Sequence, residues 1–410
     1  MSIDHIVSII VFIAAILLFV GLFTQTVQTA IVYQQHQAVA VKCSDLLDDM
    51  LLNPGSPNNW GQNNATATSF GVQDPEFTQY ELSAFSLMRL ESTTGQTVEF
   101  DKTNPSIFYN EETTGAGSYL LMPNAEALNY SSALSLLGLN GTYGFQLAFV
   151  PDITVSIAQT STSPLSFSVS AMGTGFPYAG ATLNYCLILV TLGQTNAQYP
   201  SYTIQTGSTV TSQQGTANIV TSNSVNANQI CSLIVYAHSD GIVGVGFETS
   251  NLPTDQYIVP IMEDMGTQQV ALAHNYDLNN SGPAGYSLKY NATFVILTQG
   301  YTLSELALGS PSSPGLVGTV TSGVGNPYPT ISMPGSTTGI LIVTYQENST
   351  DGGIAMMPWG ISSLAFPVTF GGNPALQEWV TTDLRQVTIG SVAYQAKLSF
   401  WSDQQMQVTS

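Results

Sequence analysis

The feature that most constrains this chain is an apolar run of 18 residues, Ile6 to Phe23, that contains no ionisable side chain. A run of this length and composition suffices to cross the hydrocarbon core of a bilayer as a helix. Polar residues flank it, with Asp4 and His5 before the run and Gln25 after it, as expected where a span meets water on both sides. The sequence therefore predicts that Ile6 to Phe23 contacts membrane lipid as one membrane-spanning helix.

A cleaved signal peptide is the main alternative for this segment. The apolar run is long for a signal peptide, no basic residue precedes it, and no small-residue cleavage site clearly follows Phe23. These three features favour a retained helix, with the signal peptide as the competing interpretation.

The helix is predicted to continue beyond the membrane, because neither Pro nor Gly occurs between Thr24 and Leu52. At 1.5 Å per residue, about 45 helical residues make a rod of roughly 70 Å. Asn53-Pro54-Gly55 ends the rod, since proline cannot continue the helical hydrogen-bond ladder. A heptad-like stripe at spacings of three and four marks one face of the extension: Val32, His36, Val39, Cys43, Leu46 and Met50. The stripe favours packing of the helix on its own domain, and a seam with neighbouring subunits is the alternative.

The sequence around this stop carries a family resemblance. The extension ends in CSDLLDDMLLNPGSPNNW (residues 43–60), and FGVQDPEFTQYELSAFSLMRL (residues 70–90) follows. Together with the apolar helix, these stretches resemble archaeal type IV pilin-like and pseudopilin-like membrane proteins over about the first 90 residues. The resemblance implies a membrane-anchored surface protein that forms a homo-oligomer or filament through its N-terminal helix. The start MSIDH lacks the basic residues and the small residue of the prepilin pattern, which puts processing by a prepilin peptidase in question.

The composition is acidic and poor in charge. The 410 residues carry a net charge of −20, only 8% are charged, and Lys and Arg total six, whereas charged residues make up about 25% of an ordinary soluble protein. Six scattered cations exclude nucleic acid as a partner, because phosphate binding needs clustered cations. A surface of Ser, Thr, Asn, Gln, Gly and Tyr suits a cell-surface protein, so we expect a single-pass protein of the cell membrane with the bulk of its chain extracellular. The positive-inside rule gives no orientation, since only Lys42 lies near the span.

Beyond Trp60 the sequence pattern is that of β structure. A short helix is predicted near Ser83 to Leu90, and beyond Gly95 runs of β-branched and aromatic residues alternate with Gly, Asn, Pro and Ser clusters. Predicted strands cover residues 97–100, 144–150, 165–171, 181–190, 230–238, 242–248, 286–297, 339–345 and 387–401. The fold class is therefore mainly β: a long N-terminal α-helix followed by antiparallel β-sandwich domains.

The middle of the chain carries the clearest sequence motifs. It contains GTGFPYAGATL (173–183), TVTSQQGTANI (209–219) and ICSLIVYA (230–237). These stretches resemble the immunoglobulin-like modules of prokaryotic surface proteins over about 100 residues. Gly215 lies where a hairpin turn needs a permissive backbone, and Ala217 and Ile219 then point to one face.

The predicted domain plan follows from these patterns. It comprises the helix at 1–53, a β-rich domain with a short helix at 54–151, an immunoglobulin-like β-sandwich at 152–252 and a C-terminal β-rich domain at 253–410. The last strand pattern, 387–401, is expected to return to an earlier sheet.

Two residue types offer candidate covalent sites. Cys186 and Cys231 lie in two apolar strands 45 positions apart, and either a disulfide in an oxidising exterior or two unpaired buried cysteines fits that placement. Cys43 lies on the helix stripe and is predicted to be a small core residue. Candidate N-glycosylation sequons occur at Asn64, Asn129, Asn140, Asn279, Asn291 and Asn348. Their number is about what chance gives in a chain this rich in Asn, Ser and Thr. The sequons are therefore compatible with an extracellular location of the body but do not indicate it.

No catalytic or metal-binding motif stands out. The chain has no Gly-x-Ser-x-Gly, His-Glu-x-x-His, Walker or Cys-x-x-Cys pattern. His238-Ser239-Asp240 holds triad residue types, but consecutive residues cannot form a triad. Asp277 begins a stretch like a calcium loop whose twelfth position is Leu288 instead of the required Glu. We therefore expect no cofactor, no enzymatic activity, and a structural or adhesive surface role. The alternatives are an anchored extracellular enzyme or solute-binding subunit acting on polymer, and an accessory subunit of a membrane complex.

Overall fold

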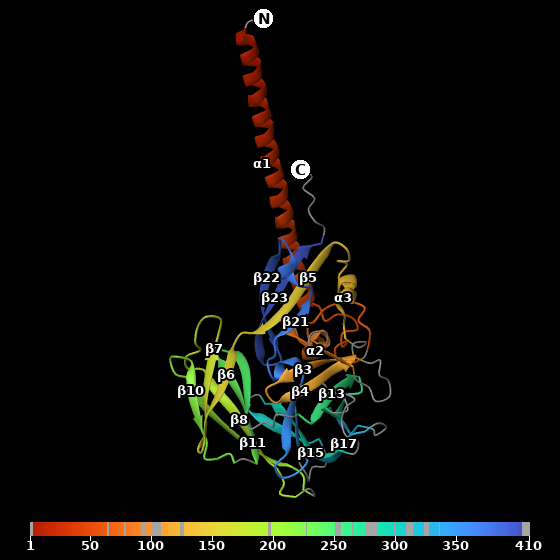
Figure 1. The fold of residues 1–410 in the computed structure, drawn as a ribbon, viewed down its shortest axis with the longest axis vertical. Coiled ribbons are helices and arrows are strands. Elements are labelled where there is room, and N and C mark those ends of the chain that lie inside the picture. Colours follow the sequence, from red (N-terminus) through yellow and green to blue (C-terminus); the bar gives the residue numbers. More distant parts are fainter. Residues whose placement is uncertain are drawn as a thin grey trace.

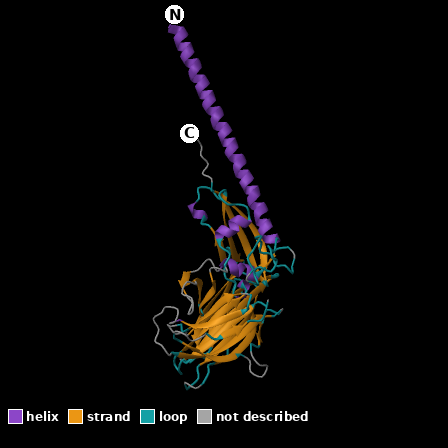
Figure 2. Ribbon diagram, turned by 90° about the vertical axis from the view of Figure 1, so that its right-hand side faces the viewer, coloured by secondary structure: helices purple, strands orange, loops and turns teal. Residues whose placement is uncertain are grey.

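The protein is a body of β-sheets from which one long helix extends. The computed structural model describes residues 3–63, 65–77, 79–91, 96–99, 108–123, 127–195, 198–226, 228–250, 256–264, 266–275, 286–298, 300–308, 315–323, 328–335 and 337–403. The long helix, α1, spans Ile3–Leu52, so the predicted continuous rod is confirmed. Figures 1 and 2 show that α1 stands clear of the strands over most of its length, with the N-terminus at the far end.

The remaining helices are short. The predicted helix near residues 83–90 is confirmed as α2, Ala84–Glu91. A second short helix, α3, covers Tyr130–Leu136, and Asn129 caps it by accepting a hydrogen bond from the Ser132 N–H. Two 3₁₀ turns follow late in the chain: η1, Ile361–Ser363, and η2, Pro374–Leu376.

Sheet I lies against the base of α1. Its strands, in spatial order, are β1 (Glu81–Leu82), β22 (Thr381–Ile389), β23 (Val392–Ser402), β5 (Tyr143–Pro151) and β21 (Val368–Gly371). Helix α1 contacts β22 and β23. The expected return of the C-terminal strand to an earlier sheet is confirmed, because β23 pairs with β5 from Tyr394 to Ser402.

Sheets II and III come entirely from the middle of the chain. Sheet II has the order β10 (Thr216–Val220), β7 (Leu165–Met172) and β6 (Thr154–Thr162). Sheet III has the order β12 (Ile242–Ser250), β11 (Gln229–Ser239), β8 (Thr182–Thr191) and β9 (Ser201–Val210). Alternate residues of β7, among them Phe167 and Val169, are buried in a core that both sheets share.

Sheets IV and V complete the body. Sheet IV has the order β18 (Thr330–Ser332), β14 (Gln269–His274), β13 (Ile258–Asp264), β4 (Gly117–Pro123), β3 (Phe108–Thr114) and β2 (Gln96–Glu99). Sheet V has the order β16 (Leu303–Leu306), β15 (Ser287–Leu297), β19 (Gly339–Gln346) and β20 (Gly352–Trp359), with β17 (Leu316–Thr321) also paired to β15. Among the described strands, only the pairs β1–β22 and β13–β4 are parallel.

The sheets correct the predicted domain plan. Segment 152–252, hereafter the middle module, forms sheets II and III by itself. Segments 54–151 and 253–410 do not form separate sheets, because sheets I and IV each take strands from both. Sequence periodicity predicts where strands lie but not which strands pair. It therefore could not predict that these two segments share sheets.

Sheet III lies between two cores. On β11, Leu233 and Val235 face the core shared with sheet II, whereas Ile234 and Tyr236 belong to the main core with residues of sheet V such as Phe294. Both faces of the strand are therefore covered, and the burial pattern of β11 is nearly continuous instead of alternating. The middle module is consequently docked on the rest of the body through an apolar face.

The predicted single strand at 387–401 is wrong. The segment is a hairpin in which β22 ends at Ile389 and β23 begins at Val392. Gly390 makes the turn with φ of +59°, a conformation that glycine adopts without strain.

Candidate functional site: the N-terminal helix and its junction with the body

The outer part of α1 is an exposed apolar surface. In the described part of the chain, α1 is the one helix long and apolar enough to cross a membrane, and none of its most apolar 18-residue window is buried. Phe12 and Leu17 are each 66% exposed and Phe19 is 70% exposed. A soluble monomer rarely presents an apolar surface of this extent, and by its length and composition this helix could span a membrane.

The predicted stripe on the helix extension packs against the protein's own body. Cys43 and Met50 are fully buried, and Val39 and Leu46 pack against the main core. This outcome confirms the interpretation of the stripe as an intramolecular contact.

Two ring contacts mark where α1 leaves the body. The His36 imidazole stacks on the Trp379 indole, with ring centroids 4.0 Å apart and planes 5° from parallel. The Lys42 Nζ lies 4.0 Å from the centroid of the Tyr143 ring, within the range of a cation–π interaction. Sequence reasoning placed His36 on the stripe but gave no hint of its partner.

An ionic cluster joins α1 to β22. The Arg385 guanidinium donates to both carboxylate oxygens of Asp48, from Nε to Oδ1 at 2.8 Å and from Nη2 to Oδ2 at 3.1 Å. Nη2 also donates to Ser44 Oγ at 2.9 Å, and Nη1 lies 2.9 Å from Asp383 Oδ1. The Tyr80 hydroxyl donates to Asp48 Oδ1 at 3.0 Å. The cluster thus ties two turns of the helix base to one strand.

The cluster shifts the pKa values of its members. The pKa of Arg385 lies above its usual range, first because of its hydrogen bond to Asp48, with further contributions from Tyr80 and Asp383. Burial alone would raise the pKa of Asp383, but hydrogen bonds from Ser44, the Leu384 N–H and Arg385, with the charge of that guanidinium, lower it overall. The folded state therefore favours the charged form of both groups.

The segment that follows α1 is packed into the body and is not an exposed linker. Trp60 is fully buried, and its Nε1 donates to the carbonyls of Pro54 at 3.1 Å and Gly71 at 3.0 Å. Arg89 of α2, 5% exposed, lies with its guanidinium 5.2 Å from the centroid of the Trp60 ring and donates to the Ala65 carbonyl at 2.9 Å. Buried charge and indole both have partners, as burial of polar groups requires.

The last helical carbonyls are satisfied by the segment that follows. The Val72 N–H donates to the Met50 carbonyl at 2.9 Å, and the Gln73 N–H donates to the Asn53 carbonyl at 3.1 Å. Gly71 allows this approach, because a Cβ at that position would lie 2.1 Å from the Asn53 oxygen. The end of α1 is therefore hydrogen-bonded to the segment that follows it and is packed into the body.

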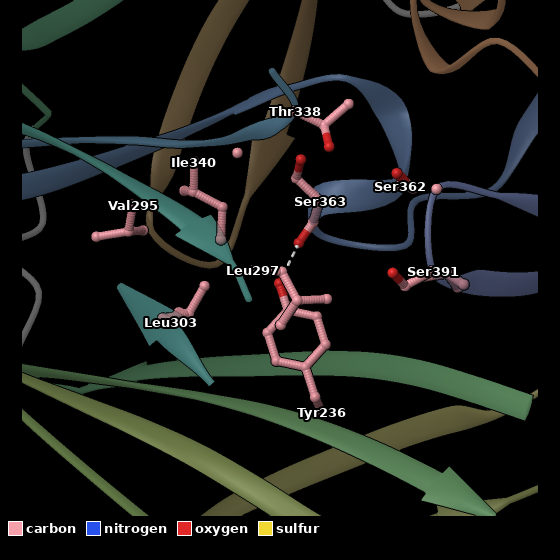
Figure 3. Close-up of a pocket in the computed structure, with 12 residues that line it drawn as sticks. Tyr236, Val295, Leu297, Leu303, Thr338, Ile340, Ser362, Ser363 and Ser391 are labelled. Carbon is pink, nitrogen blue, oxygen red and sulfur yellow. Dashed lines mark hydrogen bonds between the residues drawn. The ribbon is translucent and has the colours of Figure 1, made fainter. Parts of the chain in front are cut away.

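A small cavity of about 70 Å³ lies where sheets I, III and V meet (Figure 3). Tyr236, Leu303, Ile340, Ser363 and Ser391 contribute to its lining, and the Tyr236 hydroxyl donates to the Ser363 carbonyl at 3.0 Å. Sites for drug-sized ligands have volumes of about 300–1,000 Å³. A cavity of this size does not accommodate a sugar unit.

The disulfide interpretation of Cys186 and Cys231 is corrected by the structure. All three cysteines are free and buried. Cys186 faces Ile234 across the β8–β11 pair, three residues from Cys231, so the two thiols lie on opposite faces of sheet III and in different cores. Three residues of strand span about 10 Å, beyond the roughly 7 Å limit for a bridgeable Cα pair.

The sequons fall in different environments. Asn129 and Asn140 are exposed, Asn291 lies within β15, and Asn348 lies in the turn between β19 and β20. Asn64 and Asn279 lie outside the described residues, as does Asp277 of the calcium-like stretch. Among the described residues, no group of three or more His, Cys, Asp or Glu side chains is placed to hold a metal ion.

The anchoring residues Arg385, Asp48 and Trp379 were missed by sequence reasoning. Arg385 had one available signal, because it is one of only six cations in an acidic chain and needs carboxylate partners when half-buried. The fold brings these residues together across more than 300 positions, which no local pattern reports.

Comparison with known proteins gives little. No family model and no curated protein matches the chain. Among solved structures, it is similar to red sea bream transglutaminase at 11% sequence identity and a TM-score of 0.17. The match covers 57% of this chain and 33% of that one, so the chain spans about a third of the length of that structure. A likeness this slight carries no argument about fold or function.

Proposed function

We propose that this chain is a membrane-anchored structural or adhesive protein of the cell surface, pilin-like at its N-terminus, with its β body outside the membrane. The observation that carries the proposal is the division of α1. Its outer part exposes apolar side chains such as Phe19, whereas its base is fully buried at Cys43, Leu47 and Met50. The same helix therefore supplies both the proposed membrane anchor and part of the core of the body.

The continuity of α1 supports a retained anchor over a cleaved signal peptide. The helix runs without interruption from the apolar span to Leu52, and its base contacts β22 and β23. Removal of the span would leave the extension projecting from the body with nothing attached to it.

A second apolar stripe supports association of α1 with a second copy of the chain. Val27, Ile31, Ala38 and Val41 follow a spacing of three, four and seven, and all are exposed. At 100° per residue they lie on the side of α1 away from the stripe that packs on the body. Ile31 and Val41 are 49% and 61% exposed. In a bundle of helices this face would continue the contact begun by the apolar span.

The body supports display. Sheets II and III share a core, and Gly215 makes its turn with φ of +71° immediately before β10. With the sequence resemblance described above, these features support an immunoglobulin-like sandwich as the middle module. Because the middle module shares the main core with sheet V, it forms one continuous body with the other sheets at the end of the helix.

The enzyme and solute-binding alternatives have less support. The junction cavity of about 70 Å³ is lined by hydroxyls and aliphatic groups, without a carboxylate. A polymer-acting enzyme would need a groove with paired carboxylates. A structural role needs only a surface.

The test compares the full chain with residues 25–410. We expect the full chain in the membrane fraction, its body digested by protease added to intact cells, and the shortened chain soluble, folded and monomeric at micromolar concentration. The four-residue stripe buries far less than the roughly 1,200 Å² of a stable interface, so it does not hold the shortened chain together alone. Mass spectrometry of the mature N-terminus adds the decisive control. A secreted protein that begins after Phe23 would rule out the anchor, and a stable oligomer of the shortened chain would assign association to the β body.

A further inference from the structure

One sequon has a geometry that the others lack. Asn348-Ser349-Thr350 forms the turn that joins β19 to β20, and the Glu347 N–H closes the turn by donating to the Asp351 carbonyl at 2.9 Å. Thr350 is exposed, and Asn348 is half-exposed. The sequon thus lies at the tip of a hairpin on the surface.

The carboxamide of Asn348 is held by the hydroxyl residue of its own sequon. Asn348 Oδ1 accepts hydrogen bonds from the Thr350 N–H and from Thr350 Oγ1, each at 2.9 Å. Two donors on the oxygen draw electron density from the amide and make its Nδ2 protons more acidic. One of these protons is then more easily removed, and the deprotonated nitrogen is the form that attacks an electrophilic carbon. Because both contacts occupy the oxygen, the Nδ2 group remains available.

The other described sequons differ in ways that matter for this chemistry. Asn291 lies in the centre of sheet V, paired with both β17 and β19, and its Nδ2 donates to the Pro200 carbonyl at 3.4 Å. Asn129 uses its Oδ1 to accept from Ser132, and its sequon continues into α3. Asn140 is exposed, but the Thr142 N–H of its sequon donates to the Leu139 carbonyl instead.

The Asn348 turn is built on a base that Gln346 ties to the neighbouring segment 193–198. Gln346 accepts from the Gly193 N–H at 2.6 Å and donates to the Gln198 carbonyl at 3.1 Å. The opposite end of β19, at Gly339, borders the cavity beside Gly390 of sheet I. A group attached at Asn348 would therefore lie at the end of β19 opposite to that cavity.

We propose that Asn348 is an N-glycan attachment site and that Asn291 is not; the proposal rests on the extracellular body of the proposed function. The donor class is a saccharide linked to a polyisoprenyl phosphate or diphosphate. Nδ2 attacks C1 of the sugar, the Nδ2–C1 bond forms, and the C1–O bond to phosphate breaks. The lipid phosphate leaves with the bonding electron pair and takes up the proton that Nδ2 loses, directly or through water.

The experiment measures site occupancy on the full chain purified from its native membrane. Peptides containing Asn348 are expected to carry a saccharide mass on more than half of the molecules, and peptides containing Asn291 to carry none. Asn348→Gln should remove that mass, Thr350→Ser should retain it because the hydroxyl persists, and Asn291→Gln should change nothing. Circular dichroism of each variant checks that the fold is intact.

Protease added to intact cells separates this inference from the proposed function. A bare Asn348 on a body that the protease digests overturns the glycan site and leaves the anchored surface protein standing. A body protected from the protease overturns both. Equal occupancy of Asn291 and Asn348 overturns the claim that the folded geometry selects the acceptor.

Discussion

Arg385 on β22 donates to both carboxylate oxygens of Asp48 on α1, at 2.8 and 3.1 Å. A bidentate pair of this kind fixes direction as well as distance, because the planar guanidinium and carboxylate must lie nearly edge to edge. The contact joins the first element of the chain to its last hairpin. The angle at which α1 leaves the body is therefore set in part by two side chains 337 positions apart.

We predict that Arg385→Met destabilises the body. The change removes the guanidinium that donates to Asp48 and pairs with Asp383, while keeping most of the aliphatic volume. Hydrogen bonds to charged groups contribute about 1.5–3 kcal/mol, but solvent screens this half-exposed cluster, so we expect a loss of about 1–2 kcal/mol. Urea unfolding of the full chain in detergent measures it.

Lys397→Met is the matched control for this prediction. Lys397 is exposed on β23 and faces Leu384, so its loss should change the free energy of unfolding by less than about 0.5 kcal/mol. Equal effects of the two substitutions would mean that the Arg385 cluster contributes nothing specific.

Acid should weaken the same junction. The pKa of Asp383 is lowered in the folded state, so its contribution is present above the unfolded pKa of about 3.9 and is lost as pH falls through the lower folded value. We predict that the stability difference between the wild type and Asp383→Asn shrinks as pH falls below about 4. Denaturant titrations at successive pH values test this, and a constant difference would contradict it.

Glu81 should respond in the opposite sense. Burial raises its pKa, although the hydrogen bond from Thr388 partly opposes the shift. The folded state therefore favours protonated Glu81, and stability falls as pH rises from the unfolded pKa through the higher folded pKa. Glu81→Gln, which keeps a hydrogen-bond acceptor, is expected to flatten this part of the pH profile.

The fold could be predicted from sequence where the pattern was local. α1 was predictable because both of its signals, the apolar run and the lack of Pro and Gly in the extension, lie within the helix itself. β7 was predictable because its buried residues alternate. β20 was missed, because GGIAMMPW lacks alternation and is buried on both faces in sheet V.

The site was less predictable than the fold. The stripe on α1 indicated a contact, yet its partners on β22 lie at the other end of the chain. Likewise, Cys186 and Cys231 occur in neighbouring strands, but their faces depend on the register of β8 against β11. A shift of one residue in register moves each side chain of the strand to the opposite face of the sheet. The register cannot be read from a single sequence.

The cysteines give a direct chemical prediction. We expect three reactive thiols in the unfolded, unreduced protein and almost none in the folded protein at pH 8. Burial, with a smaller effect of the charge on Glu305, raises the pKa of Cys186 to about 12, so its thiolate is scarce at that pH. Titration with a thiol reagent, with and without denaturant, measures both states. One reactive thiol after unfolding would restore the disulfide.

The two faces of α1 should separate assembly from stability. Ile31→Gln with Val41→Gln places polar groups on the exposed face, 49% and 61% accessible in the single chain. We predict an unchanged melting temperature and weaker self-association of the full chain. Losing the burial of two β-branched side chains corresponds to at least a tenfold change in dissociation constant.

Val39→Gln is the matched change on the other face. Val39 packs against the main core, so the substitution should lower the free energy of unfolding by about 1–2 kcal/mol and leave the association of folded molecules unchanged. Cross-linking and light scattering in a mild detergent follow association, and thermal unfolding follows stability. If the double substitution on the exposed face leaves association intact while Val39→Gln abolishes it in folded protein, the seam lies on the body-facing stripe and the assignment of faces is wrong.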